Sequence, residues 1–173
     1  MTTLRKLAAA LPVIAGMFGA GTALAGPDTN ISSGLTIKGP GLAVHGYDVV
    51  AYFTKGEPTV GRAKYSAVYN DATYRFASEE HLDAFEENPE RYVPQYGGYC
   101  DYGVAVGAKF DGDPHLWRIV DGKLYLNLNE DIQETWEKDI PGNIEDADRN
   151  WRRIAHKTPR ELSLESDSRV HVR

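Results

Sequence analysis

The chain has 173 residues, of which 25 are acidic and 19 are basic, so its formal net charge at pH 7 is -6. An acidic surface repels phosphate backbones and anionic lipid headgroups, which argues against a nucleic-acid partner. The chain contains one cysteine. A single thiol cannot form an internal disulfide, so a disulfide-stapled fold is excluded.

The first 25 residues have the pattern of a secretory signal peptide. Arg5 and Lys6 precede an apolar run over residues 7–20, and an Ala-Leu-Ala sequence ends at Ala25. This order predicts Sec-type export, cleavage after Ala25 and a periplasmic location. The run is too short and too rich in Gly and Ala to be a membrane span, and no later segment is long enough. The mature chain is therefore predicted to be soluble, without a transmembrane segment.

Cleavage would divide the chain into four parts. Removing 25 of the 173 residues leaves 148 and a net charge of -8, because the signal holds two basic and no acidic residues. That length supports one domain. Residues 26–41, rich in Gly, Pro, Ser and Thr, predict a flexible lead-in. We expect the folded domain over residues 42–155 and a disordered polar tail over residues 156–173.

The strand signals predict two β-hairpins and one further extended segment. Residues 65–69 and 73–76 alternate in polarity around an Asn-Asp turn and predict the first hairpin. Residues 116–120 and 123–128 flank an Asp-Gly pair, which is typical of a type I′ turn, and predict the second. Residues 48–53 are β-branched and aromatic, so they predict a buried strand or extended segment.

Capping residues predict three helices. The first follows Ser78 and ends at Asn88, the second follows Asn129 and ends at Pro141-Gly142, and the third follows Asn143. Residues 92–107 interleave tyrosines with glycines and predict a loop. The elements together predict a small single α+β domain with two β-hairpins, a short capped helix after the first hairpin and two C-terminal helices.

One motif in the middle of the chain resembles the YHS domain family. Its residues are Tyr74, Phe76, Ser78, Phe85, Asn88, Pro89 and Tyr92. The segments GYDVVAYF at residues 46–53, PQYGGYC at residues 94–100 and DGKLYLN at residues 121–127 look like the stand-alone exported branch of that family in Gram-negative bacteria.

The resemblance implies a small α+β domain and a thiolate metal role. Metal-associated members carry a Cys-x-x-x-Cys pair at the start of the helix. The matching positions in this chain are Ala77 and His81. The thiolate pair is therefore absent, and a metal site would need other ligands.

His81 and Cys100 are the first candidates for such a site. A helix N-terminus disfavours the imidazolium form, so His81 could keep a nitrogen lone pair for a metal. The alternative is a boundary histidine on an amphipathic helix. Cys100 could supply a soft thiolate for Cu or Zn. The alternative is a small buried side chain packed by tyrosines, since free cysteines are commonly buried.

His45 is the third candidate ligand, together with Asp48. A Cys, His, His and Asp set would suit zinc, whereas Asp48 is equally a turn or capping acceptor. His115 is expected at the surface. The aromatic residues Tyr47, Tyr52, Tyr96, Tyr99, Tyr102 and Trp117 either fill the core or line a small-ligand pocket.

These residues lead to two functional hypotheses for an exported binding domain that is not an enzyme. In the first, a transition metal, Cu or Zn, is bound through His81, Cys100 and His45. In the second, the protein is a metal-free module that binds an exported protein partner or a small ligand, and Cys100 is structural. Redox or other chemistry at Cys100 is a third hypothesis, but the sequence identifies no catalytic base or oxyanion site for it.

Overall fold

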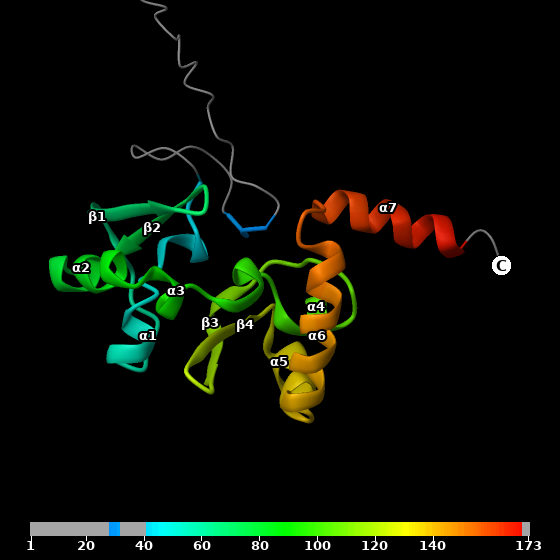
Figure 1. Cartoon of the computed structure of the whole chain (residues 1–173). Coiled ribbons are helices and arrows are strands. Elements are labelled where there is room, and N and C mark those ends of the chain that lie inside the picture. Colours follow the sequence, from blue (N-terminus) through cyan, green and yellow to red (C-terminus); the bar gives the residue numbers. More distant parts are fainter. Residues whose placement is uncertain (1–27, 32–40, 171–173) are drawn as a thin grey trace, which may run out of the picture.

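The computed structural model describes residues 28–31 and 41–170 and has the expected α+β fold (Figure 1). Its first half contains η1 (Val44–Gly46), α1 (Ala51–Thr54), β1 (Arg62–Tyr69), β2 (Ala72–Phe76), α2 (Glu79–Glu87) and α3 (Pro89–Tyr92). Its second half contains η2 (Gln95–Gly98), α4 (Asp101–Ala105), β3 (Asp113–Val120), β4 (Lys123–Asn127), α5 (Glu130–Glu137), α6 (Ile140–Ile154) and α7 (Pro159–Val170).

Both predicted hairpins are confirmed. Strands β1 and β2 pair antiparallel, as do β3 and β4. The turn residues Asn70 and Asp71 both have positive φ, and so do Asp121 and Gly122. Two successive positive φ values are the signature of a type I′ turn, whose twist matches that of the strands. The local turn chemistry therefore sets the position of each hairpin.

The predicted caps of the first two helices are also confirmed. The Ser78 hydroxyl accepts a hydrogen bond from the backbone N–H of His81 at 3.3 Å, where α2 begins. The Asn129 side chain accepts one from Ile132 at 2.9 Å, where α5 begins. Such caps satisfy N–H groups that the first helical turn leaves without a partner.

The predicted strand over residues 48–53 is wrong, because this segment turns into helix α1. The Asp48 carboxylate accepts hydrogen bonds from the backbone N–H groups of Val50 and Ala51 at 2.9 and 3.2 Å. These bonds start a helical turn in a sequence whose side chains favour a strand. The alternative interpretation of Asp48 as a capping acceptor is the one that holds.

Two further elements differ from the prediction. The predicted loop over residues 92–107 contains helix α4, with Cys100 at its N-cap. Helix α6 begins at Ile140, before the Pro-Gly pair that was expected to end the preceding helix. Its N-cap is Asp139, which accepts from Gly142 at 3.0 Å. Proline is well tolerated in a first helical turn, so Pro141 belongs to this helix.

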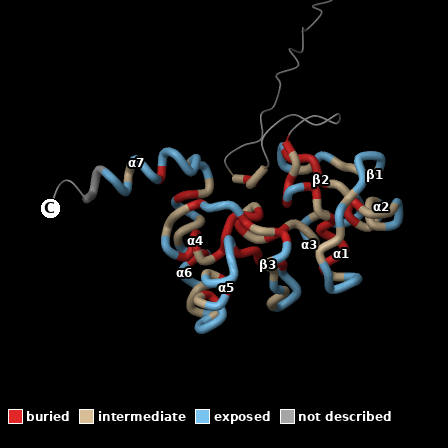
Figure 2. The backbone as a smooth tube through the Cα atoms, turned by 180° about the vertical axis from the view of Figure 1, so that it is seen from behind, coloured by how far each residue is buried: buried red, intermediate tan, exposed pale blue. Residues whose placement is uncertain are grey.

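The predicted disordered tail instead contains helix α7, which extends away from the body (Figures 1 and 2). The helix is held at its start by a capping box between Thr158 and Glu161, with bonds of 3.2 and 2.7 Å. Leu162 packs into the core there. The signal peptide, and the predicted lead-in apart from residues 28–31 and 41, lie outside the described residues. Asn30 of this segment donates to the carbonyl of Gly97 at 2.9 Å.

Two hydrophobic clusters hold the fold together. The first joins the β1–β2 hairpin, α1 and α2 around Tyr52, Phe76 and Phe85, and the second joins α4, α5 and α6 around Trp136. Strand β4 contributes to both, with Leu124 in the first cluster and Tyr125 in the second. Buried backbone accordingly runs through the centre of the molecule (Figure 2).

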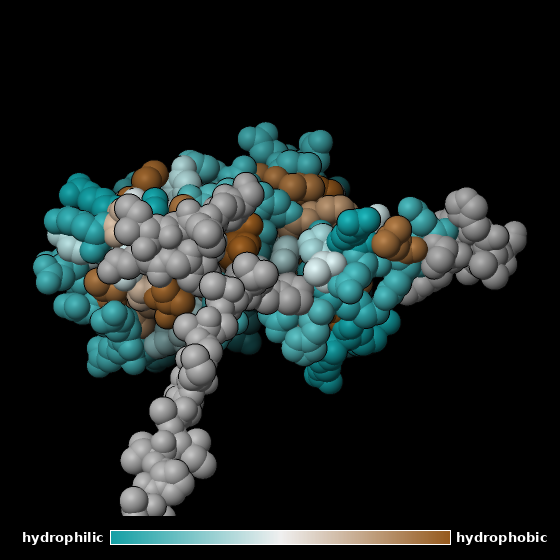
Figure 3. Space-filling view, turned by 90° about the horizontal axis from the view of Figure 1, so that it is seen from above, coloured by the Kyte–Doolittle hydropathy of each residue, from teal (hydrophilic) through white to brown (hydrophobic). Residues whose placement is uncertain are grey.

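The aromatic residues mainly fill these clusters. Tyr52, Tyr96 and Tyr99 are buried, whereas Tyr47, Tyr102 and Trp117 are partly buried against the clusters. Core packing is therefore the better of the two interpretations. Apolar surface on the face seen in Figure 3 is divided into separate patches. Within the described residues, no helix has the length and apolar character needed to cross a membrane.

Candidate functional site

His81 is held by a buried carboxylate. Its Nδ1 lies 2.6 Å from Oδ2 of Asp48, whose side chain is 0% exposed, while the His81 side chain is 14% exposed. Besides the two N–H groups at the start of α1, Asp48 accepts the backbone N–H of Ala77 at 2.8 Å. One carboxylate thus joins the start of α1 to the start of α2. Four donors compensate the burial of its charge.

The second ring nitrogen of His81 also has a partner. Its Nε2 lies 3.1 Å from the Thr54 hydroxyl, at the end of α1. Because Nδ1 faces the Asp48 carboxylate, the proton on the neutral ring resides on Nδ1 and the lone pair on Nε2. The His81 lone pair is therefore directed at an exposed hydroxyl. No signal in the sequence identified Thr54.

Cys100 lies in a different part of the molecule. Its sulfur is buried, accepts the backbone N–H of Gly103 at 3.4 Å and lies 3.7 Å from the side-chain oxygen of Asn127. Burial raises the pKa of the Cys100 thiol, although the N–H of Gly103 partly opposes this effect. A buried thiol with a raised pKa is poorly suited to act as a thiolate ligand or nucleophile.

His45 has yet another partner. Its Nε2 lies 3.0 and 2.9 Å from the two oxygens of Asp111, while Asp48, the expected partner of His45, binds His81 instead. His115 is exposed, as expected, and bonds the hydroxyl of Tyr47 at 2.9 Å. Among the residues described, no three His, Cys, Asp or Glu side chains are grouped so that they could hold a metal ion.

Three residues near Cys100 have buried polar atoms. Both carboxylate oxygens of Asp101, the side-chain nitrogen of Asn127 and the indole nitrogen of Trp136 are buried without a hydrogen-bond partner among the described residues. Burial raises the pKa of Asp101 from its usual 3.8 to about 7, and the nearby Asp148 charge adds to the shift. An aspartate next to a cysteine carries no sequence signal of such burial.

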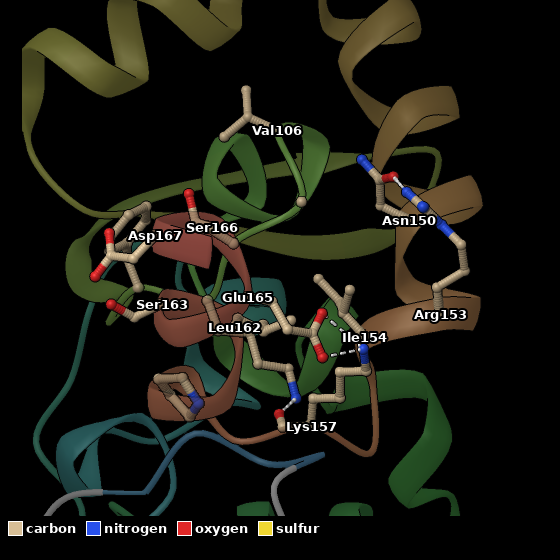
Figure 4. Close-up of a pocket in the computed structure, with 15 residues that line it drawn as sticks. Val106, Asn150, Arg153, Ile154, Lys157, Leu162, Ser163, Glu165, Ser166 and Asp167 are labelled. Carbon is tan, nitrogen blue, oxygen red and sulfur yellow. Dashed lines mark hydrogen bonds and ion pairs between the residues drawn. The ribbon is translucent and has the colours of Figure 1, made fainter. Parts of the chain in front are cut away.

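A groove with a volume of about 710 Å³ (Figure 4) lies at the opposite end of the molecule from α2 (Figure 1). Val106 and Phe110 come from the segment after α4, Arg153 and Ile154 from α6, and Leu162 from α7. Val106 and Phe110 are 61% and 49% exposed. The groove therefore presents apolar surface beside a guanidinium group, and we name these five residues the α6–α7 groove.

Lys109 fixes one wall of the α6–α7 groove. Its ammonium donates to the carbonyls of Ala155 and Lys157 at 2.5 and 2.9 Å, just beyond the end of α6. It also lies over the rings of Tyr99 and Trp151, at 4.8 and 4.7 Å. Burial lowers the pKa of Lys109 to about 8. These contacts cap the helix C-terminus and stack against aromatic faces, so Lys109 is a structural residue.

Comparison with known proteins finds a family match for one segment of this chain. Residues 50–96 match the family model of the YHS domain. The match confirms the resemblance over α1, the β1–β2 hairpin, α2 and α3. No curated protein and no solved structure matches the chain. The YHS segment includes His81 and Thr54, whereas Cys100 and the α6–α7 groove lie outside it.

The YHS segment does not retain the donors of a thiolate metal site. The two positions that carry thiols in metal-associated members are Ala77, which has no donor atom, and His81, whose two ring nitrogens already have partners. Cys100 is buried against β4. The donor set therefore does not fit the thiolate metal role that the resemblance implied.

Proposed function

We propose that the mature protein is an exported, non-enzymatic domain that binds a small amphipathic anion in the α6–α7 groove, without a metal, and that Cys100 is structural. The observation that carries this proposal is the groove itself, which combines exposed apolar side chains with a cationic one. Ligand pockets in proteins are concave and combine apolar side chains with polar groups that set orientation, and both kinds of side chain line this groove.

Three cationic side chains, Lys109, Arg153 and Lys157, and two carboxylates, Glu165 and Asp167, line the groove, and this balance favours an anionic ligand. Arg153 donates to the side chain of Asn150 and carries its positive charge at the rim. Lys157 is paired with Glu165 at 2.6 and 2.8 Å, so that charge is already compensated (Figure 4). A planar guanidinium binds carboxylate, sulfonate or phosphate groups well. Arg153 is the group that we expect to select the ligand's charge.

A fluorescent probe tests this proposal directly. Anilinonaphthalene sulfonate has aromatic rings for Val106 and Phe110 and a sulfonate for Arg153. In a fluorescence titration of the mature protein, Val106→Asp should weaken binding about tenfold, through ~1.4 kcal/mol of lost apolar contact. Arg153→Gln should weaken it as well. Val60→Asp is the matched control, because Val60 is 66% exposed but lies outside the groove.

The titrations have results that support the groove site and results that contradict it. Weakened binding by the two groove variants and unchanged binding by Val60→Asp supports the proposal. Equal affinity in all four proteins, or no binding by the wild type, contradicts it. Circular dichroism at the working temperature confirms that each variant is folded before the titration.

A copper or zinc site remains the second candidate function. The observation that favours it is the bond from His81 to Asp48, because metal-ligating histidines usually direct their other nitrogen at a carboxylate. Cu(I) and Zn(II) titrations of the wild type, His81→Ala and Cys100→Ala test it. One bound equivalent that is lost in His81→Ala supports this candidate, and equal behaviour of all three proteins rejects it.

Export is the part of the proposal that rests on the sequence alone. N-terminal sequencing of the protein from a periplasmic fraction should start at Gly26. A protein that retains Met1, or that stays in the cytoplasmic fraction, contradicts the predicted location.

A further inference from the structure

We infer that Thr54 is a covalent acylation site of this protein, with an activated ester as the acyl donor. The inference rests on the row of side chains Asp48, His81 and Thr54, and it is independent of the α6–α7 groove. A buried carboxylate, an imidazole and an exposed hydroxyl lie in hydrogen-bonding sequence, with separations of 2.6 and 3.1 Å.

Each member of the row has the surroundings that this chemistry needs. Asp48 is buried and held by three backbone N–H groups, so it fixes the orientation of the His81 ring. His81 directs the Nε2 lone pair at Thr54. Thr54 is exposed at the end of α1, where an ester could reach the hydroxyl oxygen. An imidazole oriented by a carboxylate is the arrangement that activates hydroxyl nucleophiles in unrelated folds.

Thr135 serves as a comparison for Thr54, because it has a similar helical hydrogen bond but, in the part of the chain that the structure describes, no histidine partner. The single proton of the Thr54 hydroxyl has two acceptors within reach, the carbonyl of Val50 and His81 Nε2, both at 3.1 Å. The Thr135 hydroxyl makes the same helical bond, to Asp131 at 2.9 Å, and the residue is partly exposed. No contact with a histidine is found for Thr135 among the described residues. The two threonines therefore differ in the base and share the helical bond.

The reaction balances without any further component. The Thr54 oxygen attacks the ester carbonyl, and His81 Nε2 takes the hydroxyl proton. The C–O bond to the leaving group breaks, and His81 returns the proton to the departing oxygen. The products are an acylated Thr54 and one free alcohol or phenol. No redox step or metal is involved.

The test uses p-nitrophenyl acetate on the full mature protein, with peptide mapping by tandem mass spectrometry to locate acetyl groups on hydroxyls. General-base assistance contributes about 100-fold or more to such reactions, so Thr54 should be acetylated about 100-fold faster than Thr135. Thr54→Val should lose the label, and Thr135→Val should keep it. His81→Ala should slow labelling of Thr54, and added imidazole should restore it.

Tyr47 is an internal competitor, because its hydroxyl bonds His115 at 2.9 Å. Faster labelling of Tyr47 than of Thr54 would overturn the inference. Equal rates at Thr54 and Thr135, or a labelling rate unchanged in a folded His81→Ala protein, would overturn it as well. Circular dichroism establishes that the His81→Ala protein is folded, and the exposed position of Thr54 makes Thr54→Val the safer second variant.

Discussion

The buried Asp101 makes the stability of this protein depend on pH in an unusual direction. Its carboxyl group is 0% exposed, and neither oxygen has a hydrogen-bond partner within the described part of the chain. Burial raises its pKa from 3.8 to about 7. The Asp101→Asn substitution keeps the shape of the side chain and removes the ionisation. We expect it to become increasingly stabilising, relative to the wild type, as pH rises.

The sign and size follow from proton linkage. Below about pH 4 the carboxyl is protonated in both the folded and the unfolded chain. Between about pH 4 and 7 only the unfolded chain ionises, so the free energy of unfolding falls as pH rises. Each pH unit in this window lowers the free energy of unfolding by about 1.4 kcal/mol, so the rise from about pH 4 to 7 lowers it by about 4 kcal/mol. Above pH 7 both states are ionised and this contribution no longer changes.

Urea denaturation followed by tryptophan fluorescence, at constant ionic strength from pH 4 to 8.5, measures this effect. The difference in unfolding free energy between Asp101→Asn and the wild type should grow by up to about 4 kcal/mol across the window. Asp83→Asn is the control, because Asp83 is exposed on α2. Parallel stability curves for Asp101→Asn and the wild type would refute the reasoning.

Three further results are expected. Asp48→Asn should lower the free energy of unfolding at pH 7 by about 3 kcal/mol in urea denaturation, because it breaks a buried charge interaction, and a loss below 0.5 kcal/mol would contradict this role. Cys100 should react with a disulfide reagent ~100-fold more slowly in the folded protein than in urea, and a fast folded-state reaction would show an accessible thiol. Lys109→Met should lower the melting temperature through ~2 kcal/mol of lost hydrogen bonds to carbonyls, and an unchanged melting temperature would argue against the cap.

The elements that the sequence predicted correctly depend on local signals. Both hairpin turns carry residues that accept positive φ, and the caps Ser78 and Asn129 bond N–H groups three residues away. The start of α6 has a local signal too, because Asp139 is a good N-cap and Pro141 a good first-turn residue. The prediction missed it because the same Pro-Gly pair also fits the end of the preceding helix.

The partners of the candidate residues Asp48, His81 and His45 could not be predicted, because these contacts join residues that are distant in sequence. Asp48 and His81 are separated by 33 positions, and His45 and Asp111 by 66. Composition and spacing indicated candidate ligands, but they did not indicate that Asp48 would bond His81 and not His45. The β-branched residues after Asp48 favoured a strand, and the two N–H bonds to its carboxylate outweighed that propensity.

The most direct test of the proposed function is an amide chemical-shift titration of the mature, isotope-labelled protein with anilinonaphthalene sulfonate. We expect saturable shifts to concentrate on residues 106–110, on Arg153 and Ile154 at the end of α6, and on the start of α7 around Leu162, all of which line the cavity of the α6–α7 groove. Shifts centred on Thr54 and His81, or no saturable shifts at all, would contradict a ligand site in the groove.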